Sequence, residues 1–193
     1  MNTPNKLTIF RIILTPVFLA ALLIEFPQHY LVATLLFVIA SITDLIDGKM
    51  ARKHNLITTL GKLLDPLADK VLVTAALLAF IKLGLCDVWA VMIILAREFL
   101  ITSIRMVATT QGVVIPANIY GKVKTVLQMV AIISILGFSW LTGLLADFNV
   151  LPAFIAQNIW ILYEVLIWAS VVMTVVSGVI YVKDTRKVVD FSK

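Results

Sequence analysis

The chain has 193 residues, of which 61% are apolar and 14% charged, and its formal net charge is +5 at pH 7. A soluble domain has about half apolar and a quarter charged residues, so this composition excludes an ordinary soluble protein and predicts an integral membrane protein. The basic residues are scattered over several short segments and form no basic domain, which argues against nucleic acid as a partner and favours membrane lipids with anionic headgroups.

Six apolar stretches follow one another along the chain. They comprise residues 7–24, 30–43, 63–83, 88–107, 119–145 and 159–182. All but the second have close to, or more than, the roughly 20 residues that a membrane-spanning helix needs. No linker, low-complexity tract or internal repeat separates them. The sequence therefore predicts an all-α integral membrane protein with six transmembrane helices in a single domain, residues 1–193.

The basic residues predict how these helices are oriented. They collect before the first helix, between the second and third, between the fourth and fifth, and after the sixth, whereas the opposite connections contribute only Lys82. Basic residues accumulate on the cytoplasmic side of membrane proteins. We therefore expect a multi-pass protein of the cell membrane, with both termini and the acidic segment described next on the cytoplasmic side.

The segment that joins the second and third predicted helices is unusually acidic for a membrane protein. It contains Asp44, Asp47, Asp65 and Asp69. The second apolar stretch is fourteen residues long, about 21 Å as a helix, so it carries the first two acids into the inner part of the membrane. The third helix runs back and brings the other two to a similar depth. Each carboxylate at bilayer depth costs roughly 2.5–3.5 kcal/mol, which a bound divalent cation would offset.

The spacing of these acids supports a metal site. Asp44 and Asp47 are three residues apart and Asp65 and Asp69 are four apart, so each pair shares one face of a helix. Facing pairs would put four carboxylates around one volume, between the second and third helices and near the cytoplasmic side. Carboxylate oxygens suit Mg²⁺ or Mn²⁺, and sites of this kind usually act on phosphates. We therefore expect one or two divalent cations and phosphoryl-transfer chemistry.

Small residues lie beside the acids. Gly48 and Gly61 each cost about 1 kcal/mol relative to alanine inside a helix, and Ala51 extends the same gap. The missing side chains would let a ligand approach the backbone beside the metal. Close packing between membrane helices would explain the same small residues equally well.

From Asp44 to Asp69 the sequence follows the pattern D-x2-D-G-x2-A-R-x8-G-x3-D-x3-D. Every fixed position matches the signature of the CDP-alcohol phosphatidyltransferase family, which the chain resembles over nearly its whole length. The resemblance implies a six-helix membrane enzyme, commonly a homodimer, that transfers a phosphatidyl group from a CDP-lipid to an alcohol and releases CMP. It also implies that Asp44, Asp47 and Asp65 are the main metal ligands. Asp69 would lie at the same site, as the candidate general base or as a fourth ligand.

Three further segments resemble the family members whose acceptor is glycerol 3-phosphate. They are residues 4–11 with Pro16, residues 96–99 with Ser103 and Arg105, and residues 121–125 with Gln128. The resemblance therefore implies CDP-diacylglycerol and glycerol 3-phosphate as substrates, and phosphatidylglycerophosphate as a product that enters phospholipid biosynthesis.

Residues besides the acids are assigned to the two substrates. The candidates for binding the CDP-lipid are Gly48, Ala51, Arg52, Gly61, Asn5 and Thr8. The phosphate of the acceptor needs cationic donors, and the candidates for it are Arg11, Arg105, Lys122 and Lys124. For Arg52 and the two lysines, a role as orienting charges at the inner membrane surface is equally available. Arg97 and Glu98 lie near mid-membrane, where an ion pair or a subunit contact would explain both, and we do not assign them to catalysis.

Other functions fit parts of this pattern. A different acceptor, such as inositol phosphate, phosphatidylglycerol or an amino alcohol, would keep the same chemistry. A divalent-cation transporter would also retain acids inside the membrane, but the outer halves of the second and third helices are almost wholly apolar. A structural scaffold gives no reason to retain four costly acids.

Overall fold

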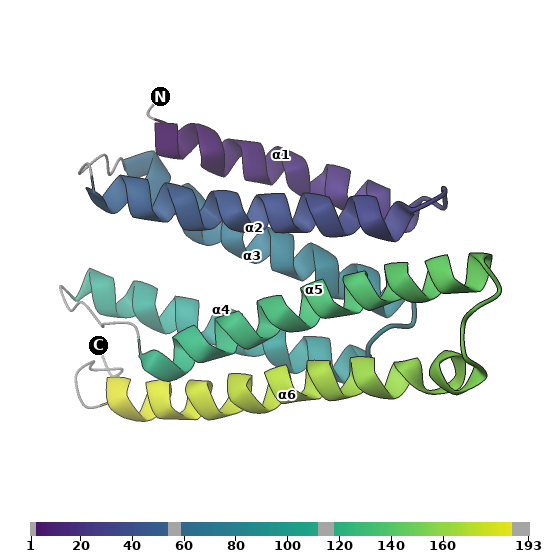
Figure 1. Ribbon diagram of the computed structural model, residues 1–193. Helices are drawn as coiled ribbons and strands as arrows, with labels where there is room; N and C mark the ends of the chain where they lie inside the picture. Colours follow the sequence, from purple (N-terminus) through teal and green to yellow (C-terminus); the bar gives the residue numbers. More distant parts are fainter. Residues whose placement is uncertain (1–2, 54–58, 112–117, 187–193) are drawn as a thin grey trace. The chain divides into compact units, whose positions relative to one another are not determined.

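A computed structural model describes residues 3–53, 59–111 and 118–186, and for residues 3–5, 45–53, 59–67, 69 and 110 it describes the backbone alone. Within these residues the chain forms six helices and no strand. They are α1 (Thr3–Leu23), α2 (His29–Lys53), α3 (Thr59–Lys82), α4 (Val88–Thr110), α5 (Ile119–Asp147) and α6 (Ala153–Thr185), shown in Figure 1. The predicted all-α fold and the predicted number of helices are confirmed.

The helices begin and end within four residues of the predicted bounds, except that α2 ends ten residues later and α6 begins six residues earlier. α2 continues to Lys53 and α3 begins at Thr59, so both helices extend beyond their apolar stretches. The first pair of acids therefore lies on α2 and the second pair on α3. Because both pairs lie on helical backbone, the spacing argument for a shared face within each pair holds.

Three of the six helices are long and apolar enough to cross a membrane, judged over the described residues. They are α1, α5 and α6. α2 has a shorter apolar segment, His29–Asp44, because acidic and basic residues fill its C-terminal part. α3 and α4 also carry charged residues within their length. Membrane passage of α2, α3 and α4 therefore depends on partners for these charges, and the six predicted spans remain a prediction.

The chain divides into two compact units. Unit 1 comprises Met1–Gly84 and Ile132–Asn158, and unit 2 comprises Leu85–Ala131 and Ile159–Lys193. The helices α5 and α6 contribute residues to both units.

In unit 1, α1 packs against both α2 and α3, as Figure 1 shows. Its buried face carries Leu14, Phe18 and Leu22, and the ring of Phe18 lies 5.5 Å from that of Phe37 on α2. Small buried residues on the two facing helices allow close approach of the backbones. They are Ala33 and Ala40 on α2, and Ala68 and Ala76 on α3. This packing places the N-terminal half of α1 beside the part of α2 that carries the first acids.

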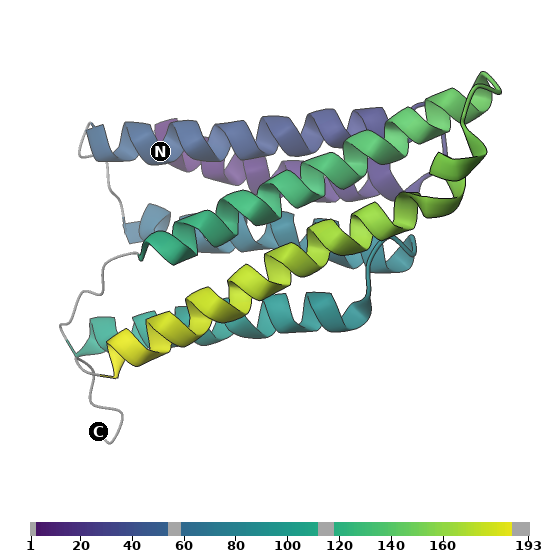
Figure 2. The same cartoon turned by 60° about the horizontal axis from the view of Figure 1, so that its bottom comes forward.

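Unit 2 is built from α4, the first part of α5 and most of α6. Figure 1 and Figure 2 both show α4 alongside the C-terminal half of α6. Asp87 caps α4, because its carboxylate accepts a hydrogen bond of 3.3 Å from the backbone N–H of Trp89. Five hydroxyl side chains recur every three or four residues on the buried side of α6. They are Ser170, Thr174, Ser177, Tyr181 and Thr185. The buried face of this apolar helix is therefore polar.

Candidate active site

A buried ion pair lies at the acidic end of unit 1. Arg11 on α1 is 1% exposed, and its Nη1 lies 2.5 Å from Oδ1 of Asp44 on α2, which is 30% exposed. A buried guanidinium needs a compensating charge, and a carboxylate meets its planar N–H groups well. Thr8, one turn before Arg11, is fully buried on the same helix. These residues give α1 a polar face at the level of the first acid.

This pairing brings together two residues that have different predicted roles. Arg11 was predicted to bind the acceptor phosphate, and Asp44 was predicted to bind a metal ion. In the structure the arginine offsets part of the negative charge of the acidic segment. Both roles therefore stay predictions.

The other predicted residues of this segment are placed by their backbone. Asn5 lies on α1, Asp47, Gly48, Ala51 and Arg52 lie on α2, and Gly61, Asp65 and Asp69 lie on α3, but their side chains are outside the described part of the chain. Among the side chains that are described, no three acids, histidines or cysteines form a group able to hold a metal ion. The predicted metal site therefore stays a prediction. Its donor set, carboxylate oxygens on two helices, has the chemistry that Mg²⁺ and Mn²⁺ require.

The second group of charges lies in unit 2 and consists of Arg97 and Glu98 on α4 with Lys124 on α5; we call it the unit 2 cluster. Nη1 of Arg97 lies 2.8 Å from Oε1 of Glu98, and Nζ of Lys124 lies 2.6 Å from the same oxygen. Nη2 of Arg97 also donates a hydrogen bond of 3.1 Å to Oγ of Ser177 on α6. The cluster therefore joins all three helices of unit 2. The expected ion pair between Arg97 and Glu98 is present.

The candidates for the acceptor phosphate occupy different environments. Lys124 is 4% exposed and belongs to the cluster, whereas Arg105 and Lys122 are exposed on α4 and α5. Thr102 and Thr109 donate hydrogen bonds to the backbone carbonyls of Glu98 and Arg105, so the polar stripe of α4 satisfies part of its own hydrogen bonding.

Buried polar residues lie in the interior of unit 2, and sequence reasoning missed those on α6. Nε2 of Gln128, Oη of Tyr181 and Oγ1 of Thr185 are buried without a hydrogen-bond partner among the described residues. Buried polar groups are normally hydrogen-bonded, so these residues stand out among the apolar side chains of unit 2. The signal was present in the sequence, as hydroxyl residues spaced by three or four positions along an apolar helix.

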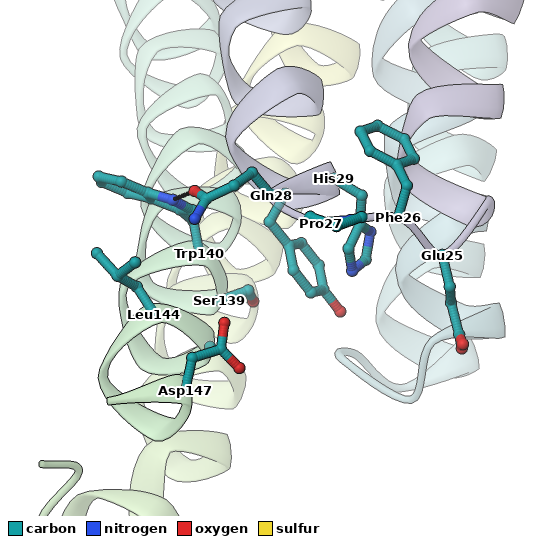
Figure 3. Close-up of a pocket in the computed structure, with 11 residues that line it drawn as sticks. Glu25, Phe26, Pro27, Gln28, His29, Ser139, Trp140, Leu144 and Asp147 are labelled. Carbon is teal, nitrogen blue, oxygen red and sulfur yellow. Dashed lines mark hydrogen bonds between the residues drawn. The ribbon is translucent and has the colours of Figure 1, made fainter. Parts of the chain in front are cut away.

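A cavity of about 440 Å³ lies at the opposite end of unit 1, between the α1–α2 turn and α5 (Figure 3). Nε1 of Trp140 donates a hydrogen bond of 2.6 Å to Oε1 of Gln28, which pins the turn against α5. Figure 3 shows Asp147 on the side of α5 and Glu25 on the side of the turn, with their carboxylates well apart. Along α2 this cavity is about 22 Å from the first acid of the motif. It is therefore a separate feature from the acidic site.

Comparison with known proteins gives a consistent result. The chain matches the family model for CDP-alcohol phosphatidyltransferase over residues 1–176. A Bacillus subtilis relative named CDP-diacylglycerol–glycerol-3-phosphate 3-phosphatidyltransferase is 39% identical over 189 residues, which are 92% of this chain and 91% of the relative. A protein of the same name from Rickettsia bellii is 37% identical over 187 residues, 96% of each chain. A probable phosphatidylglycerophosphate synthase of Mycobacterium tuberculosis is 37% identical over 184 residues, 94% of this chain and 80% of the relative.

Proposed function

The chain belongs to the CDP-alcohol phosphatidyltransferase family, and we propose that it transfers the phosphatidyl group of CDP-diacylglycerol to sn-glycerol 3-phosphate. The products are phosphatidylglycerophosphate and CMP, and the reaction belongs to phospholipid biosynthesis. One observation carries this proposal: relatives named for this reaction are 37–39% identical to the chain over more than nine tenths of its length. The three acceptor-related segments of the sequence support the same choice of alcohol.

We further propose that all six helices cross the cell membrane, with both termini and the acidic site on the cytoplasmic side. α1, α5 and α6 satisfy the length and hydropathy that a span requires. The distribution of basic residues supports the orientation. The acyl chains of the donor lipid can then remain in the bilayer while the nucleotide and the acceptor enter from the cytoplasm.

The donor site is assigned to α2 and α3. Asp44, Asp47, Asp65 and Asp69 would hold one or two Mg²⁺ or Mn²⁺ ions, which draw charge from the diphosphate and make CMP a better leaving group. Arg52 contributes a positive charge for the nucleotide phosphates. The small residues at positions 48, 51 and 61 leave the helix backbones open to the nucleotide, while Asn5 and Thr8 on α1 supply hydrogen bonds.

The proton step is assigned to Asp69. The acceptor hydroxyl attacks the phosphorus that carries the lipid, in line with the departing CMP, and a carboxylate within hydrogen-bond distance takes the hydroxyl proton. Asp69 is the last acid of the series and lies one turn beyond Asp65 on α3, which makes it the candidate for this step.

The acceptor phosphate is assigned to four cations, Arg11, Arg105, Lys122 and Lys124. Glycerol 3-phosphate carries about two negative charges, whereas an alcohol without a phosphate group lacks them. Cation-to-phosphate contacts therefore discriminate between acceptors by charge. The buried position of Arg11 beside Asp44 supports this assignment, because a second anionic group would stabilise the guanidinium further.

The test is CMP release from CDP-diacylglycerol by the purified protein in detergent, with Mg²⁺ or Mn²⁺ and with each of four acceptors. We expect release with glycerol 3-phosphate, and background release with inositol phosphate, phosphatidylglycerol or serine. Chelation with EDTA should abolish release, and added Mg²⁺ or Mn²⁺ should restore it. Preference for another acceptor would refute the proposed substrate, whereas no release with any acceptor would refute the transferase activity of this chain.

A further inference from the structure

The unit 2 cluster holds two positive side chains on one carboxylate oxygen. Arg97 lies 2.8 Å and Lys124 lies 2.6 Å from Oε1 of Glu98. One carboxylate oxygen therefore fixes the positions of two cationic groups at once.

Glu98 is itself held in place by the rest of unit 2. Nη1 of Arg97 forms the ion pair with Glu98, and Nη2 of the same guanidinium donates a hydrogen bond to Oγ of Ser177 on α6. The next residue on α6, Gly178, has no side chain, and a Cβ there would lie 3.1 Å from Cγ of Arg97. The glycine thus provides the space in which Arg97 lies. A chain of contacts runs from α6 through Arg97 and Glu98 to Lys124 on α5.

Lys124 gains orientation from this chain of contacts. A lysine side chain has four rotatable bonds and loses about 2 kcal/mol of rotamer entropy when it is fixed in one position. Here the side chain is 4% exposed, and its ammonium contacts a carboxylate of α4 that Arg97 links to α6. The rotamer entropy of Lys124 is therefore lost on folding. Binding of an anion to the ammonium then has no further entropic cost for ordering this side chain.

We propose that Glu98 is a positioning residue, which holds the ammonium of Lys124 in the place where it contacts the phosphate of the acceptor. This inference rests on the function proposed above, because it takes glycerol 3-phosphate as the acceptor. Glu98 contacts neither substrate. It acts through Lys124, and Arg97 acts in turn by fixing Glu98 to α6.

The experiment measures kcat and both KM values for the full-length enzyme and for Glu98→Gln, Glu98→Asp, Lys124→Met and the double variant E98Q/K124M. We expect Glu98→Gln to raise KM for glycerol 3-phosphate about tenfold, the effect of weakening one charged contact, and to leave KM for CDP-diacylglycerol within about twofold. Glu98→Asp keeps the charge and should restore at least part of the affinity. The double variant should be no worse than Lys124→Met alone, because Glu98 has nothing left to position.

The matched control is Glu164→Gln, the same substitution on α6 of the same unit. Glu164 accepts a hydrogen bond of 2.8 Å from Trp168 and has no role in the proposal, so both KM values should stay at the wild-type level. The proposal is refuted if E98Q leaves KM for glycerol 3-phosphate unchanged or lowers it, if it raises both KM values equally, or if its effect adds to that of K124M. A wild-type enzyme without turnover on glycerol 3-phosphate would instead refute the proposed function, and this inference with it.

Discussion

Charged side chains lie among apolar helices in both units, but the described ion pairs differ. In unit 1 one arginine, Arg11, contacts one carboxylate, that of Asp44. In unit 2 two cations, Arg97 and Lys124, share one carboxylate oxygen of Glu98. A one-to-one pair loses its whole compensation when either partner is removed, whereas a shared carboxylate holds two cations at once. The two units therefore stabilise buried charge in different ways.

The largest expected effect comes from removing an acid of unit 1. Asp65→Asn replaces a proposed metal ligand by a neutral amide, and loss of the ion's charge stabilisation should reduce kcat about a thousandfold. CMP release under saturating substrates measures it. Asp147→Asn, at the other end of unit 1, is the control and should retain wild-type kcat. Equal losses in the two variants would contradict a specific role for the acidic segment.

Breaking the ion pair of unit 1 should affect stability. Arg11→Met keeps the length of the side chain but leaves Asp44 without its guanidinium partner, and we expect a loss of about 2 kcal/mol in the free energy of unfolding. Chemical denaturation in detergent micelles measures this loss. Arg11→Lys retains the charge and should lose less. If R11M unfolds at the wild-type denaturant concentration, the pair does not stabilise unit 1.

Filling the space beside Arg97 should have a smaller effect. In Gly178→Ala the new methyl group would lie 3.1 Å from Cγ of Arg97, and the shift that relieves this contact should cost about 1 kcal/mol, which offsets the gain of about 1 kcal/mol that alanine has over glycine in a helix. Gly137→Ala is the control, since a Cβ there meets no atom within 4 Å, and it should stabilise the protein by up to about 1 kcal/mol. Thermal unfolding should therefore shift upward in Gly137→Ala and stay near that of the wild type in Gly178→Ala. Equal upward shifts would show that the space beside Arg97 is not restrictive.

Cys86, in the connection between α3 and α4, should give the smallest effect. Burial, with further contributions from the negative charges of Glu164 and Asp87, raises the pKa of its thiol to about 12. The folded protein then keeps the thiol protonated between about pH 9 and 12, while the unfolded chain ionises near pH 9, so this group lowers stability as the pH rises through that range.

Alkylation measures this difference directly. Iodoacetamide should modify the single cysteine slowly in the folded protein up to about pH 10, and rapidly after unfolding in SDS. Fast modification of the folded protein at pH 8.5 would contradict the raised pKa.

The helices and the acidic segment were predictable from the sequence for a physical reason. Membrane helices are marked by long apolar stretches, and acids spaced by three or four residues share a face on any helix, whatever its neighbours. α2 and α3 both extend into that segment, so the acids lie on helical backbone, as the spacing argument requires. The partners of Arg11 and Lys124 were not predictable in the same way. A helix that is apolar all round does not reveal which side faces its neighbours. The hydropathy pattern of α1 therefore does not predict the rotation of the helix about its axis that brings Arg11 to Asp44.

The interior face of α6 was missed for a different reason. Serine, threonine and tyrosine are common in membrane helices, and their effect on mean hydropathy is small, so a search for charges passes over them. Their spacing is informative, because Ser170, Thr174, Ser177, Tyr181 and Thr185 fall on a single face. Ser177 on this face accepts the hydrogen bond from Arg97. A search for hydroxyl residues at helical spacing would have identified the face of α6 that contacts the unit 2 cluster.

The hydroxyl residues of α6 also bear on how the protein is made. Thr174 donates to the carbonyl of Ser170 and Ser177 donates to that of Thr174, so these side chains satisfy their hydrogen bonds within their own helix. These two hydroxyl groups therefore add little to the cost of moving α6 into lipid. α4 differs, because Arg97 and Glu98 depend on Ser177 and Lys124 for part of their compensation. α6, which follows α4 in the chain, therefore completes the environment of Arg97, and a chain cut before residue 177 lacks the hydroxyl group that Nη2 of Arg97 contacts.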